Sequence, residues 1–392
     1  MSKSIQTTLI TNGLLRKSLS ATRSLGSKGI KTVVGEASWF SPSGFSKYCQ
    51  KRVSYPDPKK YRDQFLNWLI NQLKIQKNPV FMPMDDDVME VVMENIEIVK
   101  KHSKIILPTK IAFDVASDKY ETMMLSMKQA VRCPETHLPK SESELIDIAE
   151  TVVFPLVIKP RKSSGSRGIR KVENKSELLE VFNELKREYE DLMIQECIPL
   201  GDRYDVCLLY DENHEIKASF VQKELRHFPI QIGPSTVQES VLNKELIERT
   251  IRLLEPLNWR GIVEVEYMID SRTNEPVLME INPRFWNSLD LAVQSGVDFP
   301  YLLYQLSMNE KIAVQENYEV GRKSRWLFPG DLLHFLLNPK RFSMKPSFFS
   351  GKKRSIYDDT FSLSDPLPGF ILILSCIRFA FSMKALKMFF KR

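Results

Sequence analysis

The sequence predicts a mixed α/β and α+β protein that ends in a helical extension. Three observations predict this class: strand and helix patterns alternate over residues 1–115, a hairpin pattern occupies residues 261–282, and an apolar helical stripe runs through residues 366–392. The chain of 392 residues has room for two or three domains.

The composition is that of an ordinary globular protein, with 43% hydrophobic and 27% charged residues. The five cysteines form no CxxC pair and the five histidines do not cluster, which argues against a disulfide framework and a zinc site. The N-terminal residues contain no long apolar run and no signal-cleavage pattern, so a cytoplasmic protein is expected.

The net charge of +7 is unevenly distributed along the chain. Residues 322–392 contain 14 Lys and Arg against four Asp, a net charge of +10, which leaves −3 for the first 321 residues. The excess of positive charge thus belongs to the tail, and the basic residues do not form a recognisable nucleic-acid-binding module. We therefore expect no nucleic-acid partner.

The first 115 residues alternate between strand and helix patterns. Residues 7–35 read as strand, helix and strand, a helix surrounds residues 65–74, and apolar strands at 78–84 and 101–108 close the pattern. Such alternation predicts a small parallel α/β domain. Its first turn, residues 12–15, lacks GxGxxG, so a dinucleotide site is not expected and a substrate-side or structural role remains.

Three further regions follow this domain. Residues 116–190 begin with a helix and continue with two strands around a Ser/Gly-rich loop and a second helix. Residues 191–321 contain several strands, a helix near residues 242–254 and the hairpin. Residues 322–392 form a basic extension with an amphipathic helix.

A polar loop joins the two strands of the second region, directly after Lys159. Its members are Ser163, Ser164, Gly165, Ser166, Arg167 and Gly168. Glycines let backbone N–H groups turn toward a phosphate, serines add hydroxyl donors, and the two cations add positive charge. The P-loop pattern GxxxxGK[ST] is absent. A phosphate-binding loop and an ordinary polar turn both remain open.

The hairpin gathers carboxylates on one face. Because side chains two apart on a strand point the same way, Glu264 and Glu266 share a face, as do Glu280 and Asn282. Such a cluster repels itself unless a hard cation such as Mg²⁺ binds it. A solvent-facing acidic hairpin is the alternative, but the apolar residues between the acids favour a metal site. Arg284 leaves the second strand where an anion would lie.

Residues 192–206 read as a short strand, a bend and another strand. Their backbone amides can meet an adenine edge, and their carboxylates can meet ribose hydroxyls. An ordinary domain hinge explains the pattern equally well.

Taken in order, these segments resemble the ATP-grasp superfamily, in the branch similar to biotin carboxylase and the carbamoyl-phosphate synthetase large subunit. The resemblance covers roughly residues 110–310, and its most specific parts are IKPRKSSGSRGI and the ordered pair VEVEYMID and LMEINPR. It implies a Rossmann-like lobe at 1–115, a small lid subdomain at 116–190, and a large subdomain with the metal site at 191–321.

The resemblance also implies roles for the matching residues. Lys119 and Lys159 hold the phosphates of ATP, and the polar loop closes over them as a flap. The adenine hinge consists of Gln195, Glu196, Cys197 and Ile198, with Asp205 near the ribose. Both Lys159 and Arg284 take part in catalysis, Arg284 by stabilising an acyl-phosphate or the γ-phosphoryl group.

The implied metal ligands are Glu266, Glu280 and Asn282, which bind two Mg²⁺ ions or Mn²⁺ in their place. Glu264 can take the part of Glu266 because both share a face. The resemblance implies that a small-molecule carboxylate attacks ATP to give an acyl-phosphate, from which an amine or another nucleophile displaces phosphate. An ATP-binding regulatory or scaffold protein without turnover is the alternative.

Five residues are candidates for the substrate pocket because they combine cations, hydroxyls and an aromatic ring near the metal strands. They are Lys223, Arg226, Ser235, Arg260 and Trp286.

The end of the chain carries an apolar stripe at helical spacing. Its members are Leu372, Cys376, Phe379, Met383, Leu386 and Phe390, with basic residues off the stripe. The uninterrupted apolar run at 370–377 is too short to span a bilayer of about 30 Å. Two interpretations remain: a helix lying on the inner face of a membrane, or a helix docked on the protein itself or a partner subunit.

Overall fold

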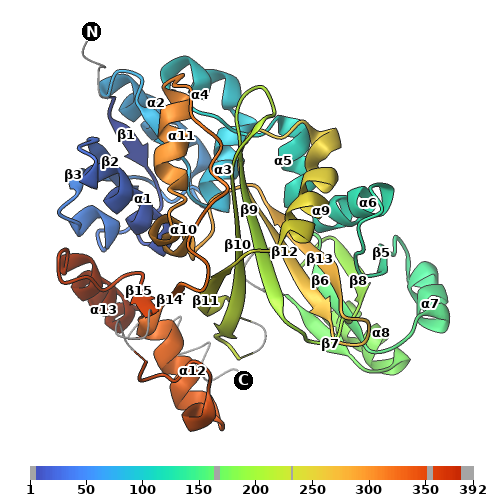
Figure 1. Cartoon of the computed structure of the whole chain (residues 1–392). Helices are drawn as coiled ribbons and strands as arrows, with labels where there is room; N and C mark the ends of the chain where they lie inside the picture. Colours follow the sequence, from blue (N-terminus) through green and yellow to red (C-terminus); the bar gives the residue numbers. More distant parts are fainter. Residues whose placement is uncertain (1–5, 163–167, 231–232, 351–355, 381–392) are drawn as a thin grey trace.

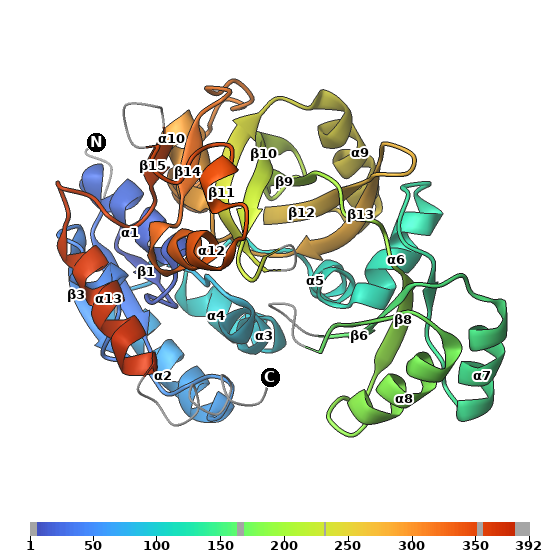
Figure 2. The ribbon, with the colours of Figure 1, turned by 90° about the horizontal axis from the view of Figure 1, so that it is seen from below.

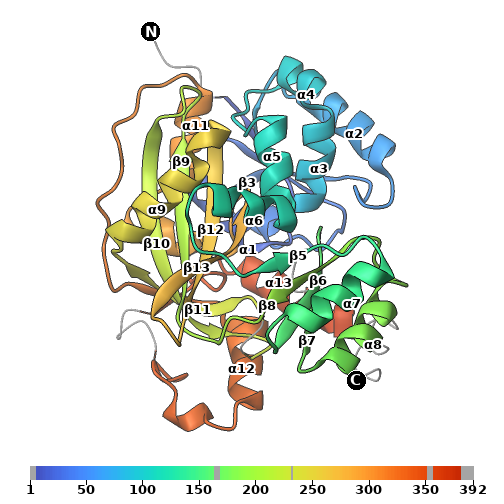
Figure 3. The same cartoon turned by 90° about the vertical axis from the view of Figure 1, so that its right-hand side faces the viewer.

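The computed structural model describes residues 6–162, 168–230, 233–350 and 356–380. Its strands form three sheets (Figure 1). Figures 2 and 3 show the sheet of the first 82 residues and a small second sheet on the same side of a large central sheet. The site described below lies among these three sheets.

The N-terminal sheet is parallel, in the order β3-β2-β1-β4. Its strands are β1 (Thr8–Ile10), β2 (Thr32–Glu36), β3 (Cys49–Ser54) and β4 (Val80–Met82). Its helices are α1 (Arg16–Ser27), α2 (Arg62–Ile75), α3 (Asp86–Glu94) and α4 (Ile96–His102). The prediction of a strand at residues 101–108 is wrong: α4 covers the first two of these residues, and Lys104 forms only an isolated β-bridge with Val80.

The central sheet has seven strands in the order β13-β12-β9-β10-β11-β14-β15. They are β9 (Arg203–Tyr210), β10 (Ile216–His227), β11 (Ser235–Val241), β12 (Gly261–Asp270), β13 (Glu275–Asn282), β14 (Lys323–Arg325) and β15 (Ile356–Asp358). One face packs on α5 (Lys110–Ser117), α6 (Lys119–Lys128) and α9 (Lys244–Leu254) around the buried Trp259. Both faces of the sheet are buried, because Val206 and Leu208 of β9 lie in this core while Cys207 and Leu209 lie in another core on the opposite face.

A shared core joins the N-terminal sheet to the central sheet. Ile10 and Met82 of the first sheet lie in one cluster with Phe285, Trp286 and Phe299. The helices α10 (Leu289–Ser295) and α11 (Phe299–Ser307) contact α1 at this boundary. Because the two parts share buried apolar surface, their relative position is fixed by packing.

The small sheet, called the lid sheet here, is antiparallel in the order β5-β8-β6-β7. Its elements are β5 (Thr136–His137), β6 (Leu156–Pro160), β7 (Arg170–Val172), β8 (Leu192–Glu196), α7 (Glu142–Thr151) and α8 (Lys175–Leu185). They pack around a core of their own, separate from the other clusters. A part with its own core can move as a unit.

Residues 322–380, called the C-terminal segment here, are not purely helical, which corrects the expectation of a helical extension. Besides α12 (Leu332–Leu337) and α13 (Leu367–Ala380), they supply β14 and β15 to the central sheet. Within the described residues no helix is long and apolar enough to cross a membrane.

The last described helix, α13, docks on the body of the protein. Its residues Ile371 and Leu372 are buried, and it contacts the short helix η1 (Ser43–Phe45). Of the stripe residues that the structure describes, Leu372 is buried, Cys376 is half-buried and Phe379 is exposed. The stripe residues Met383, Leu386 and Phe390 lie outside the described residues.

Gly261 opens β12 at a position that excludes a side chain. Its φ is +74°, and a Cβ there would lie 2.6 Å from the Ile106 carbonyl oxygen. We expect Gly261→Ala to lower the free energy of unfolding by about 3 kcal/mol, because backbone strain and steric overlap add. Chemical denaturation measures this loss. The matched variant Gly29→Ala, with φ +76° and nothing within 4 Å, should lose only about 1 kcal/mol; equal losses would contradict the steric argument.

Candidate active site

The hairpin of β12 and β13 brings four polar side chains to one place. Its register pairs Glu264 with Asn282 and Glu266 with Glu280. The Asn282 Nδ2 donates to Glu264 Oε2 at 3.2 Å, to Glu266 Oε1 at 2.9 Å and to Glu280 Oε1 at 3.3 Å. We call these four residues the acidic cluster.

Burial shapes the charge of this cluster. It raises the pKa of Glu264 to about 8, although Arg284 opposes the shift. It raises the pKa of Glu266 well above its usual value, and the neighbouring carboxylates of Glu280 and Glu264 add to the shift. Burial also acts on Glu280, but the cations Lys119, Lys159 and Arg284 outweigh it and lower the pKa of that carboxyl. Without added positive charge, the cluster therefore cannot ionise fully.

Two further carboxylates lie close to the acidic cluster on neighbouring strands. Asp205 of β9 is the register neighbour of Glu266. Burial and the nearby Glu224 of β10 raise the pKa of Asp205 well above its usual value. Asp205 is thus adjacent to the acidic cluster on the neighbouring strand, and its charge acts on Glu266. The position of Glu224 near Asp205 could not be predicted, because nothing in the local sequence distinguishes Glu224 from a surface glutamate.

Lys119 and Lys159 approach the acidic cluster from two different elements. Lys119 is the first residue of α6, whose N-cap Asp118 accepts hydrogen bonds from the next turn, and its Nζ lies 3.7 Å from Glu280 Oε2. Lys159 lies on β6 of the lid sheet and is 6% exposed. Burial, followed by the charge of Lys119, lowers the pKa of Lys159 to about 8. Both cations lie near the Glu280 carboxylate, whose charge partly offsets the lowering of the Lys159 pKa.

Arg284 is held by the N-terminal end of α3. Its Nε lies 2.6 Å from Asp86 Oδ1, and its Nη1 donates to the Phe285 carbonyl at 3.2 Å. The buried Lys17 joins this network, with its Nζ 2.7 Å from Asp85 Oδ1. No local pattern reveals these contacts, although residues 85–87 lie shortly after β4, where the carboxyl ends of parallel strands carry functional residues.

The predicted nucleotide segments are only partly described. The flap residues 163–167 lie outside the described residues, and Gly168 has φ +74°. Gln195 is buried and donates to Thr136 Oγ1 at 2.8 Å, while Glu196 forms an ion pair with Arg272. Cys197 is half-buried and Ile198 is buried. These residues end β8 and lead toward the central sheet.

Two candidates for the substrate pocket are buried in other roles. Arg226 forms an ion pair with Asp331, with Nε 2.8 Å from Oδ1, and its Nη1 donates to the Pro346 carbonyl at 2.5 Å. It therefore holds the C-terminal segment. Trp286 is 1% exposed and packs edge-to-face on Phe299, so it does not line an accessible pocket. Sequence patterns do not reveal such long-range partners.

The other three candidates are also not gathered around the acidic cluster. Ser235 is buried and its Oγ donates to Gln238 Oε1 at 3.0 Å. The Nζ of Lys223 lies 2.6 Å from Asp202 Oδ2. Arg260 lies beside His214, 3.5 Å from its Nε2. The expectation of a pocket wall built by these side chains is not supported by their contacts.

The donor set of the acidic cluster fits a hard divalent cation. Carboxylate and amide oxygens are the ligands that Mg²⁺ prefers. Burial, and after it the charges of Glu280 and Glu264, raise the pKa of Glu266, and a bound cation would oppose both effects. Among the described residues, no three His, Cys, Asp or Glu side chains already stand in the spacing of a metal site. The Asn282 oxygen and phosphate oxygens would therefore have to complete any such site.

The middle of the chain matches one family model. Residues 116–288 match the model described as an ATP-grasp domain. This region of the chain is similar to ATP-grasp domains. The predicted resemblance is thereby confirmed, and the matched range includes both lysines, the acidic cluster and Arg284.

The curated relatives that match parts of this chain are longer proteins. Acetyl-CoA carboxylase 1 of Oryza sativa subsp. japonica is 30% identical over 147 residues, 36% of this chain and 6% of that enzyme. The C-terminal section of the carbamoyl phosphate synthase large chain of Aquifex aeolicus is 23% identical over 266 residues, 65% of this chain and 49% of that protein. The chain thus spans a small part of the length of the first curated relatives that it matches.

Solved structures share the fold over more of the chain. Biotin carboxylase of Campylobacter jejuni has a TM-score of 0.67 at 16% identity, over 81% of this chain and 74% of that one. N5-carboxyaminoimidazole synthetase of Staphylococcus aureus has a TM-score of 0.63 at 18% identity, over 81% of this chain and 80% of that one. L-amino acid ligase of Bacillus licheniformis has a TM-score of 0.61 at 13% identity, over 78% of this chain and 75% of that one. The likeness reaches beyond residues 116–288.

Proposed function

We propose that this protein is an ATP-dependent ligase that activates a small-molecule carboxylate and joins it to an amine or another nucleophile. One observation carries the proposal: Lys119, Lys159 and Arg284 lie around a buried acidic cluster in which the pKa of Glu266 stays raised. Cations and a divalent metal site side by side are what phosphoryl transfer from ATP needs. The similarity to ATP-grasp domains and the likeness to biotin carboxylase and L-amino acid ligase support the same reaction class.

In the proposed reaction, a carboxylate oxygen of the substrate attacks the γ-phosphorus of ATP, and ADP leaves as the bond to the bridging oxygen breaks. Lys119 and Lys159 hold the phosphate oxygens and offset their charge. Arg284 holds the carboxylate and then the acyl-phosphate. The nucleophile attacks the acyl carbon, and phosphate leaves with the electron pair of the broken C–O bond.

Glu266, Glu280 and Asn282 would hold Mg²⁺ or Mn²⁺, with Glu264 beside them. The metal would supply charge neutralisation for the phosphates. We also propose that residues 195–198 contact the adenine, that the lid subdomain spans residues 116–190, and that the large subdomain spans residues 191–321. The lid sheet has its own core, which supports its closing as a unit over the nucleotide.

Calorimetric titration with ATP and Mg²⁺ tests the proposal. The intact protein should bind ATP in a magnesium-dependent way. Lys159→Ala should weaken binding by about 10- to 100-fold because a charged donor to phosphate is lost, and Glu280→Ala should remove the magnesium dependence. A screen of carboxylate and amine pairs for ADP release would then identify the substrates.

Two matched variants control for unspecific damage. Lys175→Ala removes an exposed cation of the same lid, and Glu275→Ala removes an exposed carboxylate from the other end of β13; both should bind ATP like the intact protein. An intact protein that fails to bind ATP would contradict the proposal. Binding without ADP release for any pair would favour the alternative, a regulatory or scaffold protein.

A further inference from the structure

The C-terminal segment turns all its carboxylates toward the body of the protein. Asp331 pairs with Arg226, Asp359 with Arg16, and Asp365 with Arg23, while Asp358 is half-buried. The fourth carboxylate is bonded as well: Asp358 Oδ2 accepts a hydrogen bond from the backbone of Leu327 at 3.1 Å. These contacts fix the segment in place and leave none of its acids exposed.

The loop after α12 carries cations that face outward, whereas Arg322 and Lys323 at the start of the segment form ion pairs. Lys340, Arg341 and Lys345 are exposed, and no ion pair joins any of them to another described residue. Between residues 332 and 357 the sequence contains six Lys and Arg and no Asp or Glu. The exposed charge of the segment therefore has a single sign, which favours a partner of negative charge.

Large apolar side chains are exposed among these cations. Phe342 is 77% exposed and Phe349 is 73% exposed. Others that are exposed in the C-terminal segment are Leu336, Leu337, Leu363, Leu367, Phe370, Ile377 and Phe379. So many exposed apolar side chains in one segment mark an interaction surface.

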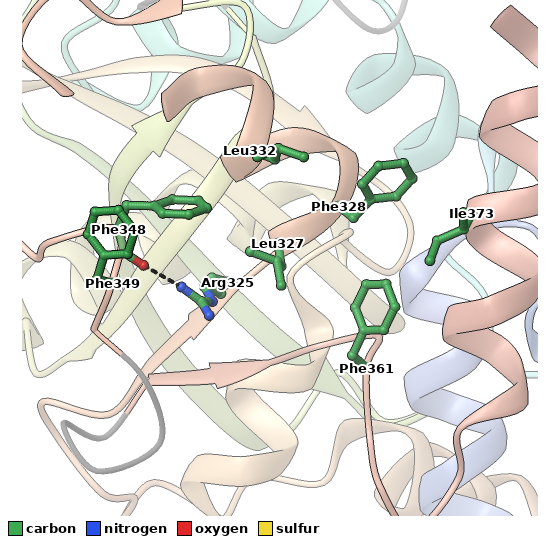
Figure 4. A pocket seen from close by; sticks show the side chains of 8 residues that line it. All are labelled: Arg325, Leu327, Phe328, Leu332, Phe348, Phe349, Phe361 and Ile373. Atoms are coloured by element: carbon green, nitrogen blue, oxygen red, sulfur yellow. Dashed lines mark hydrogen bonds between the residues drawn. The ribbon is translucent and has the colours of Figure 1, made fainter. Parts of the chain in front are cut away.

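An apolar cavity opens between α12 and α13. Its volume is about 450 Å³, and phenylalanine side chains and aliphatic groups line it (Figure 4). Leu332 of α12 and Ile373 of α13 lie on opposite sides of it. Arg325 lies at one end, with its Nη1 bonded to the Phe348 carbonyl at 2.8 Å. None of the residues of the acidic cluster lines this cavity.

The two helices of the segment lie on one side of the molecule. Figure 1 shows α12 and α13 at its lower left, and Figure 2, seen from below, shows both in front of the other elements. The elements that carry the exposed cations and apolar residues, α12 with the loop after it and α13, therefore lie on the same side of the molecule. We call this side the basic apolar face.

We propose that the basic apolar face binds the surface of a membrane that carries anionic headgroups. Lys340, Arg341 and Lys345 would contact the headgroups, while Phe342 and Phe349 enter the interfacial region and the cavity accepts an apolar group of a lipid. This inference goes beyond the proposed reaction and does not depend on turnover.

Two other occupants fit the face less well. A second copy of the chain would bring the same face against itself, and like charges would then meet without an exposed carboxylate to pair with them. A single-stranded nucleic acid would stack its bases on aromatic rings, but many of the exposed apolar side chains are leucines. Charge and aliphatic surface together favour a membrane.

Sedimentation of the full-length protein with vesicles tests the proposal. Vesicles of phosphatidylcholine with about 30 mol% phosphatidylglycerol should bind the protein, and vesicles of phosphatidylcholine alone should bind it on the order of tenfold less. The double variant Lys340→Glu/Arg341→Glu should lose at least tenfold in partitioning to the anionic vesicles, because it reverses two charges at the surface. Phe342→Ser/Phe349→Ser should lose a similar amount through the apolar contribution.

Matched double variants elsewhere on the surface provide the control. Lys100→Glu/Lys101→Glu changes the net charge equally, and Ile111→Ser/Val153→Ser removes side chains that are 75% and 83% exposed. Both controls should bind vesicles like the intact protein.

Three outcomes would overturn the proposal. They are no binding to anionic vesicles, equal losses in the test and control variants, and binding of an oligothymidylate by the intact protein without binding to vesicles. Self-association of the intact protein that the face variants abolish, in the absence of vesicle binding, would assign the face to a second copy. Thermal unfolding of every variant shows that each remains folded.

Discussion

Arg284→Lys is expected to lower kcat for carboxylate-dependent ADP release by about 10²- to 10³-fold. The guanidinium of Arg284 donates hydrogen bonds from Nε to Asp86 Oδ1 at 2.6 Å and from Nη1 to the Phe285 carbonyl at 3.2 Å. The rest of the fork stays available for an anion in the site. A lysine has one ammonium group and cannot hold Asp86 and present a planar fork at the same time. ATP affinity should change by less than about threefold, because Lys119 and Lys159 hold the phosphates.

Two variants make this expectation specific. Asp86→Asn keeps a hydrogen-bond acceptor near Arg284 but removes the charge, so kcat should fall by about tenfold with little change in KM. Arg249→Lys, on α9, where Arg249 pairs with Glu245 and not with the acidic cluster, should have no effect. If Arg284→Lys turned over at the rate of the intact protein, the proposed role of Arg284 in the reaction would be wrong.

Arg226→Ala should lower the free energy of unfolding by about 3–5 kcal/mol. Asp331 is fully buried, and burial already raises its pKa despite the ion pair with Arg226. Without its partner, the Asp331 carboxylate would have to stay buried as an uncompensated charge or take up a proton. Denaturant unfolding measures the loss.

The sign of the pH dependence follows from the raised pKa of Asp331. Below the pKa of the unfolded state, near about 4, the carboxyl is neutral in both states and the variant loses little stability. As the pH rises, the unfolded state ionises first, so the loss caused by Arg226→Ala should grow with pH.

Two further variants separate the ion pair from ordinary packing. Arg226→Met/Asp331→Leu removes both charges and should recover most of the loss, because no buried charge remains unpaired. Lys223→Ala, which breaks an exposed ion pair on the same strand, should cost less than about 1 kcal/mol. Equal effects of Arg226→Ala and Lys223→Ala would show that the buried pair does not stabilise the C-terminal segment.

Local patterns were sufficient to predict the acidic cluster. The period of two along a strand placed Glu264 with Glu266 and Glu280 with Asn282, and the hairpin register then brings the two pairs together. The strand, loop and strand around Lys159 was predicted in the same way. These features depend on neighbours within about 20 residues, which a sequence pattern can record.

Contacts between distant segments were not predicted. Asp86 and Arg284 are 198 positions apart, and Arg226 and Asp331 are 105 apart. Arg226 and Trp286 were therefore predicted to line a pocket. In the structure Arg226 pairs with Asp331 of the C-terminal segment, and Trp286 is packed in the core. The strands β14 and β15 have three residues each, too few to show a period.

The pairing of β14 with β11 determines where the chain can be shortened. A chain that ends before Lys323 would leave the backbone N–H and C=O groups of β11 without partners along one side. Such an open edge is a template on which another copy can add its own strand, and proteins usually cover or charge it to prevent aggregation. The C-terminal segment replaces the seven-residue edge of β11 by the three-residue edge of β15, and a short edge strand is a poorer template for such pairing.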